Sequence, residues 1–195
     1  MKKVMTFLLA VVLLMGAAPE TQAQKSKTLT SKEADEILQR IVGKWQVSHF
    51  VTEYDFEKSK LVETKGTASF GKAFQGDYVH EQFELEQPNG SILQGDGFIR
   101  YSEENSQFEL VQLDKKGKSI VLMAGKWYPL YNTLLFTHVK GDKQWSKKND
   151  PNMHCLYLFK DDGTFLRVNR TIDKNGNCIV LSQDHYSYPE VADLR

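Results

Sequence analysis

The chain has 195 residues, and its 25 lysines and arginines balance its 25 aspartates and glutamates, so the formal net charge is zero. Binding to nucleic acid or to an anionic membrane surface depends on a basic excess that neutralises phosphates. The balanced charge therefore argues against either as the main partner. A chain of this length, with 41% hydrophobic residues, can bury a sizeable core and is expected to form one domain.

The N-terminus has the features of a secretory signal peptide. Two lysines precede an apolar run over residues 4–18 that is too short to span a bilayer, and the small residues Thr21 and Ala23 suit cleavage before Gln24. The alternative is a retained membrane anchor; no cysteine follows the apolar run, which argues against a lipid-anchored lipoprotein. We expect residues 1–23 to be removed and the protein to be exported, to a periplasm or out of the cell, without later membrane insertion.

A short helix is predicted next. Residues 24–29 are expected to form a disordered leader, and Thr30 and Glu33 have the spacing of a capping box, in which both side chains satisfy free backbone donors at a helix start. Four apolar residues at helical spacing then predict one apolar stripe: Ile37, Leu38, Ile41 and Val42. The helix is expected to cover one end of the domain formed by residues 30–195.

From residue 44 onward, apolar and polar residues alternate with a period of two, and turn residues interrupt the pattern. The alternation predicts ten strands, at residues 44–54, 61–70, 77–87, 91–102, 105–114, 118–126, 131–139, 152–160, 164–173 and 178–187. Gly90, Gly163 and Gly176 lie between strands and suit tight hairpins. Most links are too short for crossover helices, so we expect an all-β fold, a single antiparallel β-barrel with the short helix at one end.

Gly43 and Trp45 mark the junction between the helix and the first strand. The glycine gives the chain a sharp turn, and the indole is expected to fill the barrel floor. Gly95 and Gly97 lie inside a predicted strand, where glycines predict a bulge or bend that lets a sheet curl closed.

Gly43-Lys44-Trp45 resembles the Gly-x-Trp signature of the lipocalins and their calycin relatives. A longer series resembles a family of exported bacterial lipocalin-like domains of unassigned function: Gly66-Thr67, Phe74-Gln75-Gly76-Asp77-Tyr78-Val79, Gly95-x-Gly97 and Tyr101. This resemblance, over residues 37–140, implies a closed barrel with an internal cavity and a small, mostly apolar ligand. In lipocalins a late-strand arginine stacks over the signature tryptophan. The last predicted strand here has none, and Arg170 and Arg195 are the nearest candidates.

Alternation around Trp45 predicts which side chains point into the barrel. It places His49 on the inner face of the first strand and Glu81 on the mostly apolar face of the third. A carboxylate there must be paired, hydrated or protonated, because desolvation is costly and raises its pKa; a register slip would instead turn Glu81 to solvent. Arg167 and Arg170 lie on opposite faces of one strand, so either could bind a ligand carboxylate in the interior, or lie on the surface.

The ligand-binding candidates are four residues: His49, Glu81, Tyr101 and Arg167. No catalytic residue is predicted, and no histidines are spaced as a zinc set. A single histidine could ligate a haem, and His49, His154 and His185 are the conceivable ligands. A lone histidine is more often structural, so we expect no metal and no cofactor.

The two cysteines, Cys155 and Cys178, have one whole predicted strand between them. In a simple meander their separation is two strand spacings of about 4.8 Å, which exceeds the roughly 7 Å limit between bridged Cα atoms. We therefore expect two unpaired, partly buried thiols, although an exported protein could form a disulfide if the strand order were different.

Three functions remain open from the sequence. The leading hypothesis is a non-enzymatic barrel that binds a small, mostly apolar ligand in its interior. The second is a structural or protein-interaction barrel, in which Trp127, Tyr128 and Trp145 present an aromatic patch at one rim. The third is a haem protein, or an enzyme that uses an acid such as Glu81 in a cavity.

Overall fold

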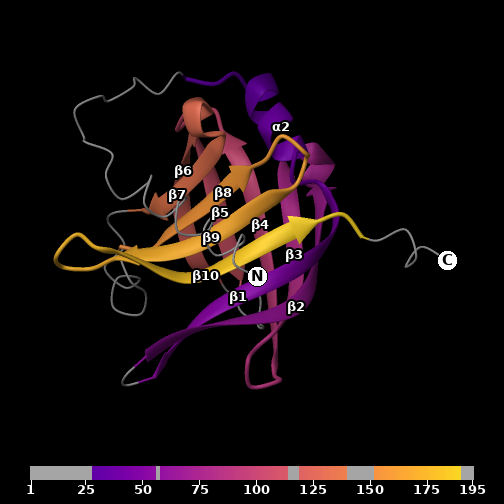
Figure 1. Cartoon of the computed structure of the whole chain (residues 1–195). Helices are drawn as coiled ribbons and strands as arrows, with labels where there is room; N and C mark the ends of the chain where they lie inside the picture. Colours follow the sequence, from indigo (N-terminus) through magenta and orange to yellow (C-terminus); the bar gives the residue numbers. More distant parts are fainter. Residues whose placement is uncertain (1–27, 56–57, 114–118, 140–151, 190–195) are drawn as a thin grey trace.

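The computed structural model describes residues 28–55, 58–113, 119–139 and 152–189. Within these ranges the strands form a closed barrel, in which each strand pairs antiparallel with its neighbours in the chain and β1 pairs with β10 (Figure 1). The strands are β1 (Gly43–Asp55), β2 (Lys58–Ala73), β3 (Tyr78–Glu86), β4 (Ile92–Ser102), β5 (Gln107–Leu113), β6 (Ser119–Tyr128), β7 (Thr133–His138), β8 (His154–Phe159), β9 (Phe165–Ile172) and β10 (Cys178–Ser187). The predicted all-β barrel is confirmed, with strand ends within a few residues of the prediction.

Hairpins at both ends of the barrel depend on glycine: Gly163 lies in the β8–β9 hairpin at the helix end, and Gly176 in the β9–β10 hairpin at the opposite end. Gly163 and Gly176 adopt φ values of 82° and 84°, which most residues with a side chain disfavour. In the β9–β10 hairpin, Asp173 also accepts backbone hydrogen bonds from Asn175 and Asn177, each at 2.8 Å. The turn residues thus fix the link lengths, and the link lengths fix the order of the strands.

The helix α2 (Ser31–Gln39) lies across one end of the barrel (Figure 1). The predicted capping box is present: Glu33 donates its backbone N–H to Thr30 Oγ1 at 3.3 Å, and Thr30 donates its N–H to Glu33 Oε2 at 2.8 Å. The apolar stripe of the helix is buried: within α2 the buried residues are Ala34, Ile37 and Leu38. None of the helices in the described residues is both long and apolar enough to cross a membrane.

Two polar contacts attach α2 to the barrel rim. Arg40, at the helix C-cap, donates to Asn132 Oδ1 at 2.6 Å and lies 4.3 Å from the centre of the Phe159 ring. Lys72 on β2 pairs with Asp35 on the other side of the helix. These contacts hold α2 as a cover, so this end of the barrel is called the closed end below. The opposite end is called the mouth.

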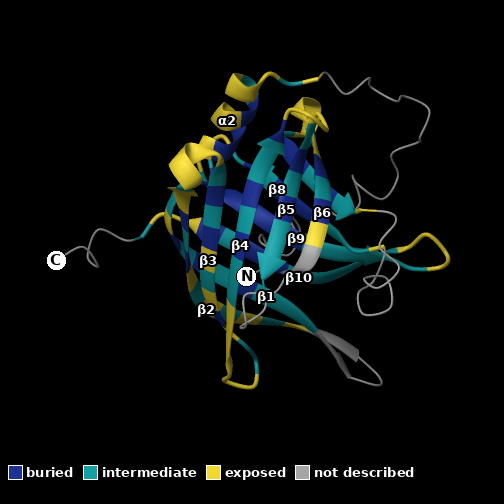
Figure 2. Cartoon of the chain, turned by 180° about the vertical axis from the view of Figure 1, so that it is seen from behind, coloured by how far each residue is buried: buried dark blue, intermediate teal, exposed yellow. Residues whose placement is uncertain are grey.

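Aromatic rings fill the closed end. Trp45 is 3% exposed, donates its indole N–H to the Ile41 carbonyl at 2.8 Å and meets the Phe165 ring edge-on at 4.9 Å. Tyr188, rather than an arginine, stacks on Trp45 at 5.0 Å. Buried residues continue along the strands as far as this end of the barrel, whereas the residues at the hairpin tips are exposed (Figure 2). Trp45 is therefore part of the barrel floor, as predicted.

Gly95 and Gly97 were expected to mark a bulge or a bend, and they carry no bulge: the pairing of β3 with β4 continues through both glycines without a shift of register. The register shifts lie elsewhere, at Gln112/Leu113 and at Val180/Ser182. Gly95 has a packing role instead: a Cβ atom built there would lie 2.0 Å from Cζ of Phe83. The missing side chain leaves room for the Phe83 ring inside the barrel.

Candidate functional site

Four ionisable side chains from four different strands are buried inside the barrel. His49 on β1, Glu81 on β3, Arg167 on β9 and Asp184 on β10 are 4%, 0%, 3% and 1% exposed. We call these four residues the buried quartet. The alternation that predicted an inward His49 and Glu81 is thus confirmed for both, and of the two arginines that could have reached the interior the structure selects Arg167.

The quartet forms one continuous chain of charge-assisted contacts. Arg167 donates its Nη1 to Glu81 Oε1, and its Nε to Asp184 Oδ2 at 2.8 Å. The second oxygen of Asp184, Oδ1, lies 2.5 Å from Nδ1 of His49. Asp184 and His49 are direct partners in the pairing of β1 with β10, so barrel closure brings them together although 135 positions separate them in the chain.

Aromatic side chains enclose the guanidinium of Arg167. Its Cζ lies 4.8 Å from the ring centre of Phe83 and 5.7 Å from that of Tyr186, distances at which a cation is attracted to the face of a ring. Tyr157 donates its hydroxyl to Glu81 Oε2 in a long contact of 3.5 Å. These rings exclude water from the quartet, which strengthens its internal charge interactions.

The pKa values of the two carboxylates of the quartet are shifted in opposite directions. Burial raises the pKa of Glu81, and the charge of Arg167 only partly opposes this. Burial also acts to raise the pKa of Asp184, but the charge of Arg167 and the hydrogen bond with His49 outweigh it, so the pKa is lowered. Burial acts to lower the pKa of Arg167, but the charge of Glu81 and its other neighbours raises it overall, so the guanidinium stays charged. Asp184 is the firmly ionised acid, and Glu81 takes up a proton more readily.

Half-buried polar side chains line the inner face between the quartet and the mouth. Thr64 faces His49 across β1 and β2, and Nε2 of Gln87 lies 3.4 Å from Nε2 of His49. Asn169, two residues from Arg167 on the same face of β9, donates to Ser182 Oγ at 3.1 Å. This part of the interior is therefore polar and reached by solvent, whereas the closed end is apolar.

A family model described as a protein of unknown function, DUF1579, matches residues 30–186. The chain belongs to the DUF1579 family. The whole quartet lies in the matched range. A search of curated proteins found no match.

In this DUF1579 barrel, Tyr101 lies apart from the quartet. Its hydroxyl donates to the Leu29 carbonyl at 2.9 Å, and its ring meets Phe108 edge-on at 5.2 Å, so it fastens the segment that precedes α2. The structure thus brings together three of the four predicted ligand-binding residues. The leader predicted at residues 24–29 is described from Thr28 onward, and Leu29 packs against the core.

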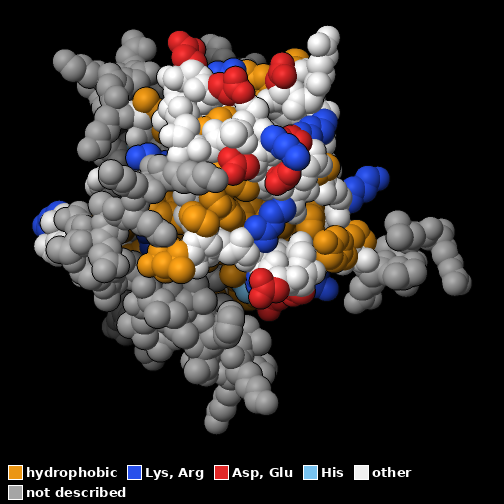
Figure 3. Space-filling view, turned by 90° about the horizontal axis from the view of Figure 1, so that it is seen from above, with side chains coloured by type: hydrophobic (Ala, Val, Ile, Leu, Met, Phe, Trp, Pro, Cys, Tyr) orange, Lys and Arg blue, Asp and Glu red, His pale blue; other side chains and the backbone are white. Residues whose placement is uncertain are grey.

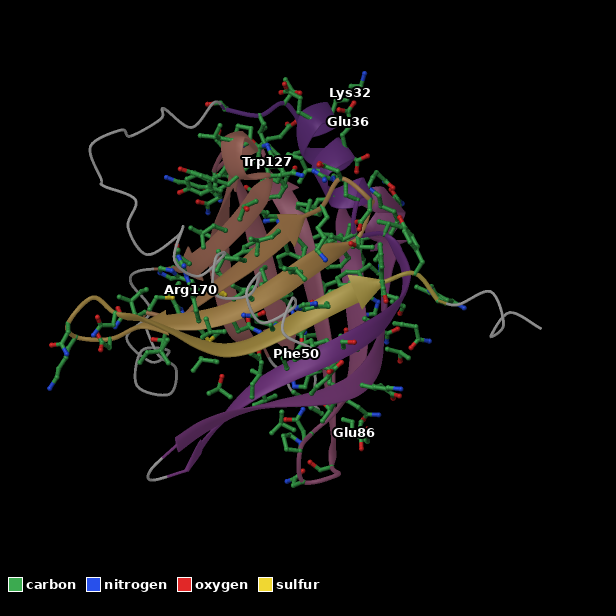
Figure 4. All side chains as sticks on the ribbon, viewed as in Figure 1. Lys32, Glu36, Phe50, Glu86, Trp127 and Arg170 are labelled. Atoms are coloured by element: carbon green, nitrogen blue, oxygen red, sulfur yellow. The ribbon has the colours of Figure 1, made fainter. Side chains whose placement is uncertain are left out.

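His154, His185 and Arg170, which were considered for other roles, lie on the outer face, and Arg195 lies outside the described residues. His185 packs against Phe50 at 4.8 Å, and His154 pairs with Arg170 across β8 and β9. Arg170 is therefore outside the barrel, where Figure 4 shows it on β9. Of the conceivable haem ligands, only His49 points inward, and Asp184 already engages its Nδ1 atom. The described residues hold no group of three or more His, Cys, Asp or Glu side chains that could bind a metal ion.

Sequence reasoning missed Asp184 and Tyr157. Asp184 lies between Gln183 and His185 in a strand whose alternation is interrupted by the shift at Val180/Ser182, so no periodic pattern marks it as inward-facing. Its position opposite His49 would have identified it, but only once the register of β1 against β10 was known.

The cysteines are unpaired, as predicted. Cys155 is buried beside the quartet, and burial raises the pKa of its thiol to about 12. Since the thiolate is the reactive form, Cys155 is unsuited to act as a nucleophile near neutral pH.

Trp127 and Tyr128, the two described residues of the predicted rim patch, do not share one surface. Trp127 is partly buried and packs against the core, with its ring 5.8 Å from that of Phe159, and Figure 4 labels it at the closed end beside α2. Tyr128 is 37% exposed. Trp145 lies outside the described residues.

Proposed function

We propose that this DUF1579 chain is an exported, lipocalin-like barrel that binds a small molecule in its interior, with the buried quartet at the base of the binding site and the mouth as the entrance. The observation that carries the proposal is the quartet itself. Replacing a buried ion pair by apolar residues of similar volume is often neutral or stabilising by about 1–4 kcal/mol, so stability alone does not account for four buried ionisable groups.

The division of the interior supports the same proposal. The closed end already has the packed aromatic core that a small barrel needs, with Trp45, Phe165 and Tyr186 in mutual contact. Toward the mouth, apolar walls such as Leu85 and Met123 alternate with half-buried polar groups. A site with apolar walls and a few convergent polar groups is the usual form of a small-molecule site.

The first test is native mass spectrometry of protein purified from its own host, before and after denaturation. A reproducible small-molecule adduct is expected, and its mass would give the ligand class. The N-terminus measured in the same experiment tests export, because cleavage before Gln24 is expected. Retention of residues 1–23 would contradict the export part of the proposal.

A second test locates the site with the neutral dye Nile red and two tryptophan variants of adjacent residues on β2. Thr64→Trp places a large ring on the inner face opposite His49, and Lys65→Trp places the same ring on the exposed outer face. We expect saturable binding to the parent protein and to Lys65→Trp, and at least about tenfold weaker binding to Thr64→Trp. Equal affinities for both variants would contradict an interior site.

A protein-interaction barrel remains the second candidate because hydrophobic side chains are exposed at the closed end. Phe74 is 64%, Leu130 71% and Tyr131 58% exposed, and Figure 3 shows hydrophobic side chains on this face beside charged ones. The 3₁₀ turn η1 (Phe74–Gly76) holds Phe74 at φ 51°, a conformation unfavourable for a bulky residue. Co-purification of a defined partner that is lost in Phe74→Ser, with no dye bound in the interior, would favour this candidate.

A further inference from the structure

Tyr186 has a buried hydroxyl group without a hydrogen-bond partner among the described residues. The side chain is 1% exposed, and its ring stacks on Phe165 at 4.2 Å. Burial raises the pKa of Tyr186 far above its ordinary value, so the phenol keeps its proton and can donate it. Buried polar groups are nearly always satisfied by protein or water, so this hydroxyl indicates an acceptor that the described part of the chain does not supply.

The hydroxyl belongs to the same interior region as the buried quartet. Arg167 lies over the Tyr186 ring at 5.7 Å, and the charges of Arg167, Asp184 and Glu81 all act on the phenol. A ligand atom that accepts the Tyr186 proton would therefore lie beside the quartet. Its chemistry is restricted by the charges already present there.

Those charges disfavour an anionic head group. Arg167 uses Nη1 on Glu81 and Nε on Asp184, so a ligand carboxylate would have to displace one of these acids or lie next to both. With both acids ionised, the quartet has one net negative charge when His49 is neutral and no net charge when His49 is protonated. A net positive charge arises only if Glu81 and His49 hold protons at the same time, so the expected arginine–carboxylate recognition is not favoured.

Resting on the proposed interior binding function, we infer that the ligand is a neutral amphiphile whose alcohol, ketone or ester oxygen accepts a hydrogen bond from the Tyr186 hydroxyl, and that the site discriminates against carboxylates of the same length. The apolar rings around the guanidinium contact the carbon skeleton beside that oxygen. The neutral oxygen would satisfy the Tyr186 hydroxyl, which has no partner among the residues the structure describes, without adding charge to the quartet.

The test compares 1-decanol with decanoate by isothermal titration calorimetry near neutral pH, with Nile red displacement as a second readout. The parent protein is expected to bind decanol at least about tenfold more tightly than decanoate. Tyr186→Phe keeps the ring and removes only the donor, so decanol should bind about fivefold to tenfold more weakly, which corresponds to one hydrogen bond of about 1 kcal/mol.

Two variants separate the effect of the donor from general disturbance. Tyr188→Phe removes the hydroxyl of an exposed tyrosine that donates to the Gly163 carbonyl outside the site, and should leave both affinities unchanged. Glu81→Gln removes one negative charge without a change of shape, and should strengthen decanoate binding relative to decanol. Circular dichroism confirms the fold of each variant before titration.

Each outcome has one meaning. If decanoate binds as tightly as decanol, or if Tyr186→Phe leaves decanol affinity unchanged because the hydroxyl only binds water, the inference on ligand class is overturned while interior binding stands. If neither decyl compound nor Nile red binds to the parent protein, the proposed function itself fails.

Discussion

The two halves of the barrel interior use opposite chemistry. At the closed end, Trp45, Phe165 and Tyr186 pack as rings under α2, and the indole of Trp45 has its polar atom satisfied by the Ile41 carbonyl. In the middle of the barrel, Glu81, Arg167 and the rest of the quartet replace apolar packing by buried charge.

The difference shows which half of the interior stabilises the fold and which half lowers its stability. Ring packing and burial of apolar area stabilise the fold directly, whereas each charge of the quartet must first be removed from water. The apolar packing at the closed end therefore offsets the free energy needed to bury the charges of the quartet. Substitutions in the two halves should differ in size and, above all, in their dependence on pH.

Trp45→Ala should have the largest effect, a loss of about 3–5 kcal/mol in the free energy of unfolding, because it removes a large buried ring and its hydrogen bond to Ile41. Guanidinium denaturation monitored by circular dichroism measures the loss, which should be nearly constant with pH. The exposed neighbour Lys44→Ala is the control and should change the free energy by less than about 0.5 kcal/mol. A similar loss of unfolding free energy in both variants would contradict a special contribution of the buried Trp45 ring to stability.

Asp184→Asn should cost about 3 kcal/mol near neutral pH, because Arg167 and His49 lose the carboxylate that they share. The folded-state pKa of Asp184 is lowered, so its stabilising contribution is present above the unfolded-state pKa and is lost as the pH falls through the folded-state pKa. The difference from the parent protein should therefore shrink in acid. Asp77→Asn, at an exposed acid, is the control. A loss for Asp184→Asn that does not change with pH would contradict a stabilising role of the Arg167–Asp184 ion pair.

Gly95→Ala should cost about 2 kcal/mol, because its Cβ atom would meet the Phe83 ring at 2.0 Å and push the ring against Arg167. Gly71→Ala is a matched control on β2: a Cβ atom there has no neighbour within 4 Å, so its effect should be close to zero. Thermal and chemical denaturation measure both. Equal stabilities would show that the Phe83 ring can move away from the quartet freely.

Glu81→Gln should have the smallest effect on stability, about 1 kcal/mol, since the Gln oxygen can still accept from Arg167 and its NH2 group can donate to the Tyr157 hydroxyl. The folded-state pKa of Glu81 is raised by burial, so the contribution of Glu81 is fully present below its unfolded-state pKa and is lost as the pH rises through the folded-state pKa. The variant lacks this loss and should gain on the parent protein from acid to neutral pH, opposite in sign to Asp184→Asn. Denaturation at a series of pH values measures the trend, with the exposed Glu104→Gln as control.

Much of the fold could be predicted because alternation and turn residues are local signals. With Trp45 taken as inward, the period of two predicts His49 on the inner face, and the apolar face of the third strand predicts the same for Glu81; the strands place both there. Of the bulge or bend predicted at Gly95, the bulge is absent. A glycine in a strand can also allow the close approach of a ring, and only the position of Phe83 reveals that role.

By itself, the sequence determined the number of strands, the antiparallel barrel and the helix that covers one end, because hydrophobic period, capping and turn chemistry act between residues close in the chain. Only the tertiary structure decided the site. Closure of β1 on β10 placed Asp184 against His49 and selected Arg167 over Arg170, and it left the Tyr186 hydroxyl without an acceptor within the described ranges. A charged residue has the same appearance in a sequence whether it faces solvent or a partner, and the register that decides between them is set by the whole barrel.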